Sequence, residues 1–372
     1  MATLKPPSDW GLGLNSHTII AGPCSTESRE QVLKTAEALA PLPISIFRAG
    51  VWKPRTRPDS FQGAGEKAFP WLQDAALILG KPIAVEVLNP HHVELCLNNG
   101  IDVLWIGART TTNPFAVEEL AQALKGVDIP VLIKNPIIPD IYLWTGAIER
   151  LMKVGLTKLA AIHRGFFQES PSEYRYPPLW RIPLHLKKLY PGIPLWCDPS
   201  HISGNKLLIP DLCQKAIDLL FTGLMIECHI SPNEALSDSE QQLSPAELSV
   251  LLGQLEWKKE SLALHSLELN ELRDKIDLYD EEIINILSLR MQTAQQIGAV
   301  KRKAGISLLQ PGRWSQLLES RLAQGQIKGL SNQFIEELWD IIHEESLRRQ
   351  GQELAPEIKT IDFLEDGPTL QH

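Results

Sequence analysis

Charged and reactive side chains recur directly after short apolar runs in the first two thirds of the chain. Each of eight such runs ends on or next to one or two of them: Cys24, Arg48 with Lys53, Glu86, Arg109, Lys134, His163 with Arg164, Asp198 with His201, and Glu227. A single arginine in a loop is usually a solvated charge, but this repeated placement indicates one shared site. Five or six converging cations predict substrates with several negative charges, such as phosphates and a carboxylate.

A second set of side chains carries the donor atoms of a metal site. It comprises the thiol of Cys24, the imidazole of His201 and the carboxylates of Glu227 and Asp238. Mixed sulfur, nitrogen and oxygen donors suit a transition metal or zinc better than magnesium. We therefore expect one divalent ion (Mn, Fe, Co or Zn). The alternative for the cysteine alone is inert packing.

The apolar runs have the length and composition of buried strands. They cover residues 17–25, 44–50, 83–87, 103–108, 130–134, 159–164, 194–198 and 223–227, and amphipathic stretches such as 31–40, 118–124 and 144–154 lie between most of them. This alternation predicts parallel strands joined by helices, and eight such units fit a (β/α)8 TIM barrel. A doubly wound open sheet is the alternative, but no GxGxxG motif follows the first strand.

A closed barrel explains how residues far apart in the sequence share one site. The active site of such a barrel lies at the C-terminal ends of its strands, where the reactive residues are placed. Closure also brings the first strand beside the eighth. The thiol, imidazole and carboxylates of the predicted metal site therefore meet at the closing seam.

From about residue 261 the sequence has the pattern of long helices. Apolar residues spaced by three and four predict one helix over residues 264–304, about 60 Å long, and shorter helices over 311–324 and 331–350. Pro311 suits a first helical turn and Ser331 an N-cap. Two short helices cannot cover the apolar seam of the long one, so we expect an interlocked homodimer or higher homo-oligomer. The predicted domains are a barrel (1–259), a helical domain (260–352) and a flexible tail (353–372).

Cations on the long helix are placed where a ligand pocket could form. Arg290 occupies a seam position that is otherwise apolar, and Lys301 lies eleven residues further on, about 20° away around the helix. Arg273 is about 100° off that face, so it could reach the same pocket only from a partner chain. Arg313 opens the second helix. The alternative is an arginine that extends to solvent or pairs with an acid.

The composition argues against several classes of protein. The formal net charge is −9, and residues 260–372 carry 12 Lys and Arg against 19 Asp and Glu, which argues against nucleic-acid or anionic-membrane binding. No apolar stretch has the length of a membrane helix, and the start lacks the features of a signal peptide. Five cysteines without paired spacing indicate a reducing compartment, by default the cytoplasm.

Residues 17–255 contain motifs that resemble those of 3-deoxy-D-arabino-heptulosonate 7-phosphate (DAHP) synthases. The motifs are Arg48-Ala-Gly-Val-Trp-Lys53-Pro-Arg55-Thr56, Gly107-Ala108-Arg109, the strand with Lys134, Arg164-Gly165 and Asp198-Pro-Ser-His201. The resemblance implies a metal-dependent condensation of phosphoenolpyruvate with erythrose 4-phosphate. The segment from Lys53 to Thr56 favours this four-carbon substrate, because sugar-acid synthases with the same barrel differ there.

The resemblance also implies how phosphoenolpyruvate binds. Its phosphate would contact Arg109, Lys134 and Arg164, together with the backbone N–H of Ala108. Its carboxylate would contact Arg48, with Lys134 nearby.

Further roles are implied for the second substrate and for the metal. Arg55 and Thr56 would bind the phosphate of erythrose 4-phosphate, and Lys53 would lie near the reacting centre. The residues that match the family's metal ligands are Cys24, His201, Glu227 and Asp238. His163 departs from the family, in which a Glu is common before the Arg-Gly pair.

Residues 264–350 resemble the all-helical chorismate mutase family. The opening motif runs from Leu272 to Asp277, and the pocket residues match without gaps at Arg273, Arg290, Lys301, Arg313, Ser346 and Gln350. The resemblance implies rearrangement of chorismate to prephenate in a pocket that Arg273 enters from the partner subunit. Arg273 and Arg290 would pair with carboxylates, while Lys301 and Gln350 would donate to the ether oxygen. Gln310 and Trp314 depart from the family, which commonly has Asp and Glu or Gln there.

We interpret the sequence as a bifunctional enzyme of aromatic amino-acid biosynthesis. One alternative keeps the barrel enzyme but makes the helical part a non-catalytic dimerisation and sensor module, which Trp314 favours. Another makes the helical part a pyruvate lyase that acts on isochorismate. Because both main activities belong to one pathway, we also expect prephenate or chorismate to regulate the barrel from the helical part.

Overall fold

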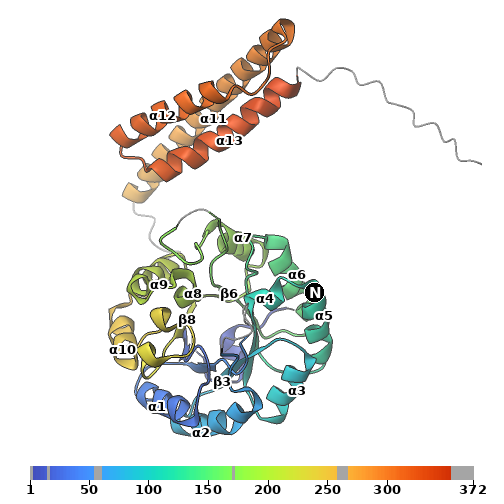
Figure 1. Ribbon diagram of the computed structural model, residues 1–372, viewed down its shortest axis with the longest axis vertical. Helices are drawn as coiled ribbons and strands as arrows, with labels where there is room; N and C mark the ends of the chain where they lie inside the picture. Colours follow the sequence, from blue (N-terminus) through green and yellow to red (C-terminus); the bar gives the residue numbers. More distant parts are fainter. Residues whose placement is uncertain (1–2, 15–16, 54–60, 170–171, 258–266, 353–372) are drawn as a thin grey trace, which may run out of the picture. The chain divides into compact units, whose positions relative to one another are not determined.

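The computed structural model describes residues 3–14, 17–53, 61–169, 172–257 and 267–352. The chain divides into two compact units, Met1–Glu260 and Ser261–His372. The first contains a closed barrel of parallel strands that follow one another in sequence order (Figure 1): β1 (Thr18–Gly22), β2 (Ile46–Ala49), β3 (Ile83–Val87), β4 (Val103–Ile106), β5 (Val131–Lys134), β6 (Leu159–His163), β7 (Leu195–Cys197) and β8 (Gly223–Glu227). The predicted (β/α)8 barrel is confirmed, because β1 pairs with β8 and closes the sheet.

Helices connect the strands and surround the barrel (Figure 1). They are α1 (Arg29–Leu39), α2 (Phe69–Leu79), α3 (Pro90–Asn98), α4 (Ala108–Thr111), α5 (Pro114–Ala123), α6 (Ile141–Lys153), α7 (Arg181–Leu189), α8 (Pro199–Ser203), α9 (Ile209–Asp218) and α10 (Pro245–Gln254). Short 3-10 turns include η1 (Pro7–Trp10), η2 (Gly65–Ala68), η3 (Lys206–Leu208), η4 (Pro232–Glu234) and η5 (Ser239–Gln241). Side-chain N-caps begin several helices, including those after Ser28, Asn113 and Ser244, as expected for residues that satisfy free backbone N–H groups.

Side chains that alternate along the strands divide the core into two layers. One set, which includes Ile46, Leu132 and Met225, fills the barrel interior, and the other packs against the surrounding helices. Trp10 closes the end of the barrel at which the strands begin. Its ring centroid lies 5.7 Å from that of Trp196, and its Nε1 donates a hydrogen bond of 3.0 Å to the carbonyl of Lys5.

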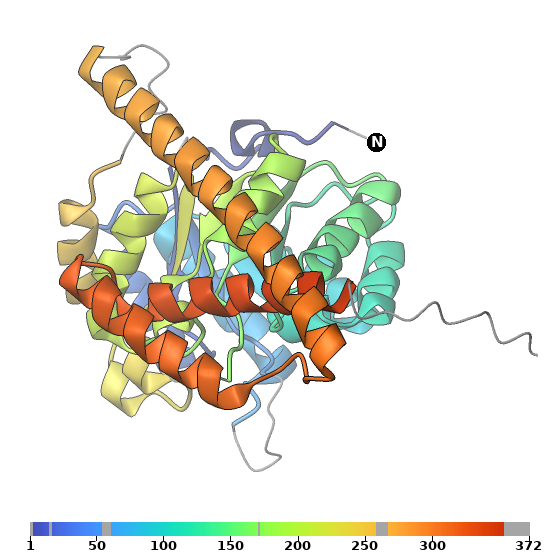
Figure 2. The same cartoon turned by 90° about the horizontal axis from the view of Figure 1, so that it is seen from above.

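The second unit consists of α11 (Leu267–Ala304), α12 (Pro311–Ile327) and α13 (Asn332–Gln352). The helix α13 packs against both α11 and α12, and α11 is the longest of the three (Figure 2). The predicted helices are confirmed: Pro311 opens α12, and the Ser331 hydroxyl accepts a hydrogen bond from the Phe334 N–H at 3.2 Å. Within this single chain a row of large apolar side chains of α11 stays exposed, including Leu272, Ile276, Tyr279, Ile283 and Ile286. None of the described helices combines the length and apolarity needed to cross a membrane.

A glycine sets the distance between α11 and α13. A Cβ atom at Gly298 would lie 2.7 Å from the Cα and from the carbonyl oxygen of Gln350. Backbone atoms at that distance cannot move aside without displacing a helix. In α12, by contrast, a Cβ at Gly312 would meet no atom within 4 Å.

We predict that Gly298→Ala destabilises the helical unit by about 1–3 kcal/mol, because overpacking outweighs the helix propensity of alanine. Gly312→Ala should leave the free energy of unfolding unchanged or raise it by up to about 1 kcal/mol. Unfolding followed by far-ultraviolet circular dichroism measures both. Equal stability of the two variants would contradict the close approach of α11 and α13 at Gly298.

Candidate active sites

The C-terminal ends of the strands surround one cavity in the barrel unit. Its lining includes nine of the residues proposed from the sequence: Arg48, Lys53, Glu86, Ala108, Arg109, Lys134, Arg164, His201 and Asp238. Gly107, Ile137 and Tyr176 complete the lining. Arg55, Thr56 and the predicted flexible tail (353–372) lie outside the described residues.

Two buried ion pairs hold cations in the cavity wall. The Arg48 Nη2 lies 3.0 Å from the Glu227 Oε1, and the Lys134 Nζ lies 2.6 Å from the Asp198 Oδ2. Both cations also lie over the ring of Trp105, with the Arg48 Cζ at 5.2 Å and the Lys134 Nζ at 6.0 Å from the centroid, an arrangement that favours positive charge. The indole of Trp105 therefore forms the floor beneath both cations.

Burial opposes each of these charges, and the partners offset it to different degrees. Burial is the largest single influence on Arg48, but Glu227, Asp198, Cys24 and Glu86 together outweigh it, so the pKa of this guanidinium is raised. Burial lowers the pKa of Lys134 in spite of the nearby Asp198. Burial also works against ionised Asp198, but His201 and Lys134 hold the pKa of its carboxyl well below the ordinary value. The site thus holds strong charges in an environment of low polarity.

Several guanidinium nitrogens of the cavity have unmet hydrogen-bonding capacity. Within the part of the chain that the structure describes, the buried Nε and Nη1 of Arg48 and Nη1 of Arg164 have no hydrogen-bond partner. The guanidinium of Arg164 lies 3.7 Å from the ring centroid of Tyr176, and its backbone N–H donates to the Asn135 Oδ1 at 2.7 Å. Because an unmet buried donor is costly, these groups are ready to receive an anion.

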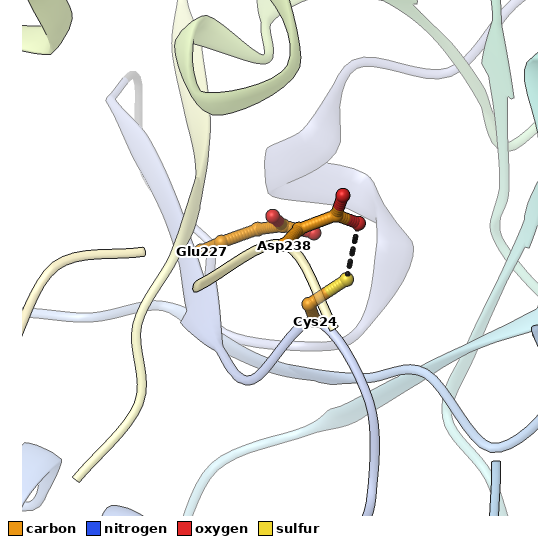
Figure 3. A group of neighbouring side chains, drawn as sticks. All are labelled: Cys24, Glu227 and Asp238. Atoms are coloured by element: carbon orange, nitrogen blue, oxygen red, sulfur yellow. Dashed lines mark hydrogen bonds between the residues drawn. The ribbon is translucent and has the colours of Figure 1, made fainter. Parts of the chain in front are cut away.

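Cys24, Glu227 and Asp238 come together beside this cavity (Figure 3). One ligand atom from each lies within 4.8 Å of those of the other two, and the Cys24 thiol donates to the Asp238 Oδ2 at 3.1 Å. The pairing of β1 with β8 places Gly22, just before the cysteine, opposite Glu227. Closure of the barrel therefore builds this group from segments far apart in the sequence.

His201, the fourth predicted ligand, lies at the edge of the group. Its Nε2 is 3.7 Å from the Glu227 Oε1, while its Nδ1 lies 2.8 Å from the Asp198 Oδ2. A carboxylate that holds one ring nitrogen while the other faces the donor group is typical of metal-binding histidines. No spacing in the sequence indicates this role for Asp198.

The electrostatics of the group fit a bound cation. Burial and then the charge of Glu227 raise the pKa of the Cys24 thiol to about 12. A thiolate beside two carboxylates therefore needs a compensating positive charge, which a divalent metal ion supplies. The donor set fits a transition metal or zinc.

In the helical unit, α11 and α13 bring several predicted pocket residues together. The Arg290 guanidinium donates to the Ser346 hydroxyl, and the Lys301 Nζ donates to the carbonyl of Leu308 at 2.5 Å. Gln350 is buried, and its Oε1 has no hydrogen-bond partner among the described residues. Burial and the nearby Arg321 lower the pKa of Arg290, which indicates a cation short of compensating negative charge.

Three other residues of this unit lie differently. Arg273 on α11 and Arg313 on α12 are exposed in the single chain. Trp314 stacks on His343, with ring centroids 3.9 Å apart and planes inclined by 15°. The departure at Trp314 is therefore accommodated by an aromatic contact with α13, which no periodicity in the sequence indicates.

Comparison with known proteins assigns both units. Residues 4–264 match the model of the DAHP synthetase I family, and residues 272–351 match that of chorismate mutase type II. A phospho-2-dehydro-3-deoxyheptonate aldolase of Thermotoga maritima is 33% identical over 235 residues, which are 63% of this chain and 68% of that protein. A crystal structure of a DAHP synthase of the same name and organism matches with a TM-score of 0.60 at 30% identity over 74% of each chain.

The helical unit has relatives of its own. The T-protein of Enterobacter agglomerans is 28% identical over 98 residues, which are 25% of this chain and 26% of that protein. The interpretation of the chain as a bifunctional enzyme is thereby confirmed at the level of its domains. The protein belongs to the DAHP synthetase I family and carries a C-terminal chorismate mutase type II domain.

Proposed function

We propose that the barrel condenses phosphoenolpyruvate with erythrose 4-phosphate and depends on a divalent metal ion for this reaction. The observation that carries the proposal is the presence, in and beside one cavity, of buried cations with unmet N–H donors and of a thiol, imidazole and carboxylate group. Anionic substrates account for the cations, and an aldehyde that needs polarisation accounts for the metal donors.

Phosphoenolpyruvate would bind across the cations of the cavity wall. Its phosphate would contact Arg109, Lys134, Arg164 and the backbone N–H of Ala108, all of which line the cavity. Its carboxylate would contact Arg48, whose Nε and Nη1 are unmet, with Lys134 nearby. These contacts replace the water that a dianion loses when it enters a buried site.

Erythrose 4-phosphate would bind through its phosphate to Arg55 and Thr56, two residues outside the described part of the chain. Lys53 would then lie near the reacting aldehyde. Burial opposes the charge of this lysine, but the neighbouring Cys24, Glu227 and Glu86 together raise the pKa of the ammonium group. A cation is therefore available where negative charge develops on the aldehyde oxygen.

The chemistry consists of one carbon–carbon bond formation and one release of phosphate. The alkene carbon of phosphoenolpyruvate attacks the aldehyde carbon, water adds to the phosphate-bearing carbon, and the adduct expels phosphate. A metal ion held by Cys24, His201, Glu227 and Asp238 would polarise the aldehyde oxygen. The chain's own cations keep two mutually repelling dianions in contact, and such positioning supplies much of the catalysis.

The helical domain would rearrange chorismate to prephenate. Arg290, held by Ser346, would pair with a carboxylate of the ligand, while Lys301 and the Gln350 side chain would donate to its ether oxygen. Gln350 is buried, and among the described residues its Oε1 has no hydrogen-bond partner, so this amide has hydrogen-bonding capacity left for a polar ligand. No nucleophile is required, because stabilising the charge of the breaking bond is sufficient.

We propose that two copies of the chain complete each mutase pocket. Seventeen residues separate Arg273 from Arg290 on one straight helix, a distance of about 25 Å. Arg273 therefore cannot reach the pocket of its own chain, and it would enter the pocket of the partner. The exposed apolar row of α11 supports a homodimer at least. Arg313, from α12, would add a further cation.

We also propose that the enzyme catalyses both reactions in the cytoplasm, as two steps of one pathway. We further propose that prephenate regulates the activity of the barrel. The motivation is the presence of both domains on one chain. Binding to one domain changes the activity of the other when the two are energetically coupled.

Cys24→Ala should lower metal-dependent condensation at least about 100-fold, because it removes the thiolate donor. Cys96→Ala is the matched control, since that cysteine is also buried but lies in α3. The measurement is phosphate release from phosphoenolpyruvate and erythrose 4-phosphate before and after treatment with a chelator. Full activity of the Cys24 variant after chelation would refute the metal assignment.

Arg290→Ala should abolish the loss of chorismate absorbance while helix content stays intact, whereas Lys303→Ala, at an exposed position of α11, should not. Identification of the product separates prephenate formation from pyruvate release. An unaltered chain that consumes no chorismate would instead support the non-catalytic sensor module.

Mixing two inactive variants tests the shared pocket. A dimer of one Arg273→Ala chain and one Arg290→Ala chain contains one pocket with both arginines intact. Random exchange of subunits should therefore restore about a quarter of the mutase activity. If Arg273 served its own chain, the mixture would stay inactive.

Prephenate should change the rate of DAHP synthesis by the unaltered protein, and this response should be lost in Arg290→Ala, whose mutase pocket is impaired. A titration of prephenate with purified enzyme measures both. A rate that stays constant across the titration of the unaltered protein would rule out the regulation.

A further inference from the structure

The turn after Asp238 carries two neighbouring buried amides, Gln241 and Gln242. Both are almost fully shielded from solvent, at 1% and 0% exposure. Polar side chains at this depth require hydrogen-bond partners. Neither glutamine lines the cavity that we assign to the substrates, and neither has a role in the chemistry proposed above.

Gln241 contacts one carboxylate of the metal group directly and the other through an arginine. Its Nε2 donates to the Glu227 Oε2 at 2.6 Å, and its Oε1 accepts from the Arg175 Nη1 at 3.0 Å. The same Arg175 nitrogen donates to the Asp238 Oδ1 at 2.9 Å. A single amide thus connects Glu227 and Asp238 through one direct and one relayed contact.

These contacts leave little freedom to either carboxylate. Glu227 has its Oε1 against Arg48 at 3.0 Å and its Oε2 against Gln241, so both oxygens are engaged. Asp238 is held by Arg175 on one oxygen and by the Cys24 thiol on the other. Its backbone φ of +49° lies in the left-handed region, which Asp tolerates better than most residues.

The neighbouring Gln242 acts on the backbone instead. Its Oε1 accepts from the Cys24 N–H at 3.0 Å, and its Nε2 donates to the carbonyl of Ser237 at 2.9 Å. It therefore joins the segment that carries Cys24 to the segment that carries Asp238. This leaves Gln241 as the amide that contacts a ligand side chain directly.

We propose that Gln241 is a positioning residue for the metal centre: its amide fixes the Glu227 carboxylate and, through Arg175, the Asp238 carboxylate. The inference rests on the proposed metal dependence of the barrel. A neutral amide meets both demands, because its N–H donates to a carboxylate while its oxygen accepts from a guanidinium. A glutamate would face Glu227 with a like charge, and a leucine would leave the Glu227 Oε2 buried without its donor.

The experiment measures the binding of Co²⁺ to the metal-free, full-length protein. The charge-transfer absorption between the Cys24 thiolate and the ion reports binding, and competition with a chelator gives the Kd. We expect Gln241→Leu and Gln241→Glu to raise this Kd by about 10–100-fold, as is usual when a group that orients a ligand is lost. Thermal unfolding of the metal-free variants checks that they fold.

Gln31→Leu is the matched control. Gln31 is also buried, at 8% exposure, and its amide contacts the backbone of Glu27 and Ser25 but no metal candidate. This variant should keep the Kd within about threefold of the unaltered protein, the spread that context alone produces. If it weakens binding as much as Gln241→Leu, the effect is one of packing and the inference is wrong.

The remaining outcomes separate this inference from the function on which it rests. A folded Gln241→Leu that binds Co²⁺ as tightly as the unaltered protein overturns the role of Gln241 alone. Should Gln241→Leu fail to fold, Gln241→Glu decides, because it keeps the size of the side chain and its contact with Arg175. An unaltered protein without the absorption band refutes the metal centre itself, and with it this inference.

Discussion

The balance of buried charge at the mouth of the barrel is the constraint on which the rest of this structure depends. An uncompensated charge in a protein interior costs several kcal/mol, so the cations need carboxylates from other strands. Arg48 of β2 meets Glu227 of β8, and Lys134 of β5 meets Asp198 after β7. The first pair spans the seam at which β1 meets β8, so it exists only when the sheet is closed, whereas the second joins strands that are separated by β6 alone. The backbones of β1 and β2 also approach each other closely beside Arg48, since a Cβ at Gly22 would lie 2.2 Å from the Arg48 carbonyl oxygen.

Most of the barrel could be predicted from the sequence, because strand and helix periods are local patterns. The same holds for Arg48, Glu86, Arg109, Lys134, Arg164 and His201, which line the cavity and lie at or just after the ends of apolar runs. The contacts that hold them could not be predicted in this way. Asp198 ends an apolar run, but no spacing indicates that it contacts Lys134 and His201. Arg175 and Gln241 act through contacts between loops, and no spacing in the sequence indicates which loops meet. Resemblance to a family also leaves such contacts open, since it matches the residues that touch substrate.

The helical domain depends on the burial of apolar surface rather than on the balance of buried charge. Its helices were predictable from their period, and so was the exposure of one face. The aromatic pair of Trp314 and His343 was not, because a stack between two helices depends on how they are packed. Burial and the nearby Arg321 lower the pKa of Arg290, whereas Arg48 and Lys134 of the barrel are paired with carboxylates.

Trp10 gives the barrel a property that its strands alone would not have. The indole lies against Trp196 at the end where the strands begin, and the Lys5 N–H donates to the carbonyl of Thr157 at 2.9 Å, just before β6. Trp10 therefore closes the barrel at the N-terminal ends of its strands, and solutes enter only at the C-terminal ends. Without Trp10, water would reach the apolar interior at the N-terminal ends of the strands. The aromatic surface of Trp196 would then be exposed and would favour aggregation. The segment before the first strand is therefore a poor place for a tag or a truncation, even though it contributes nothing to the chemistry.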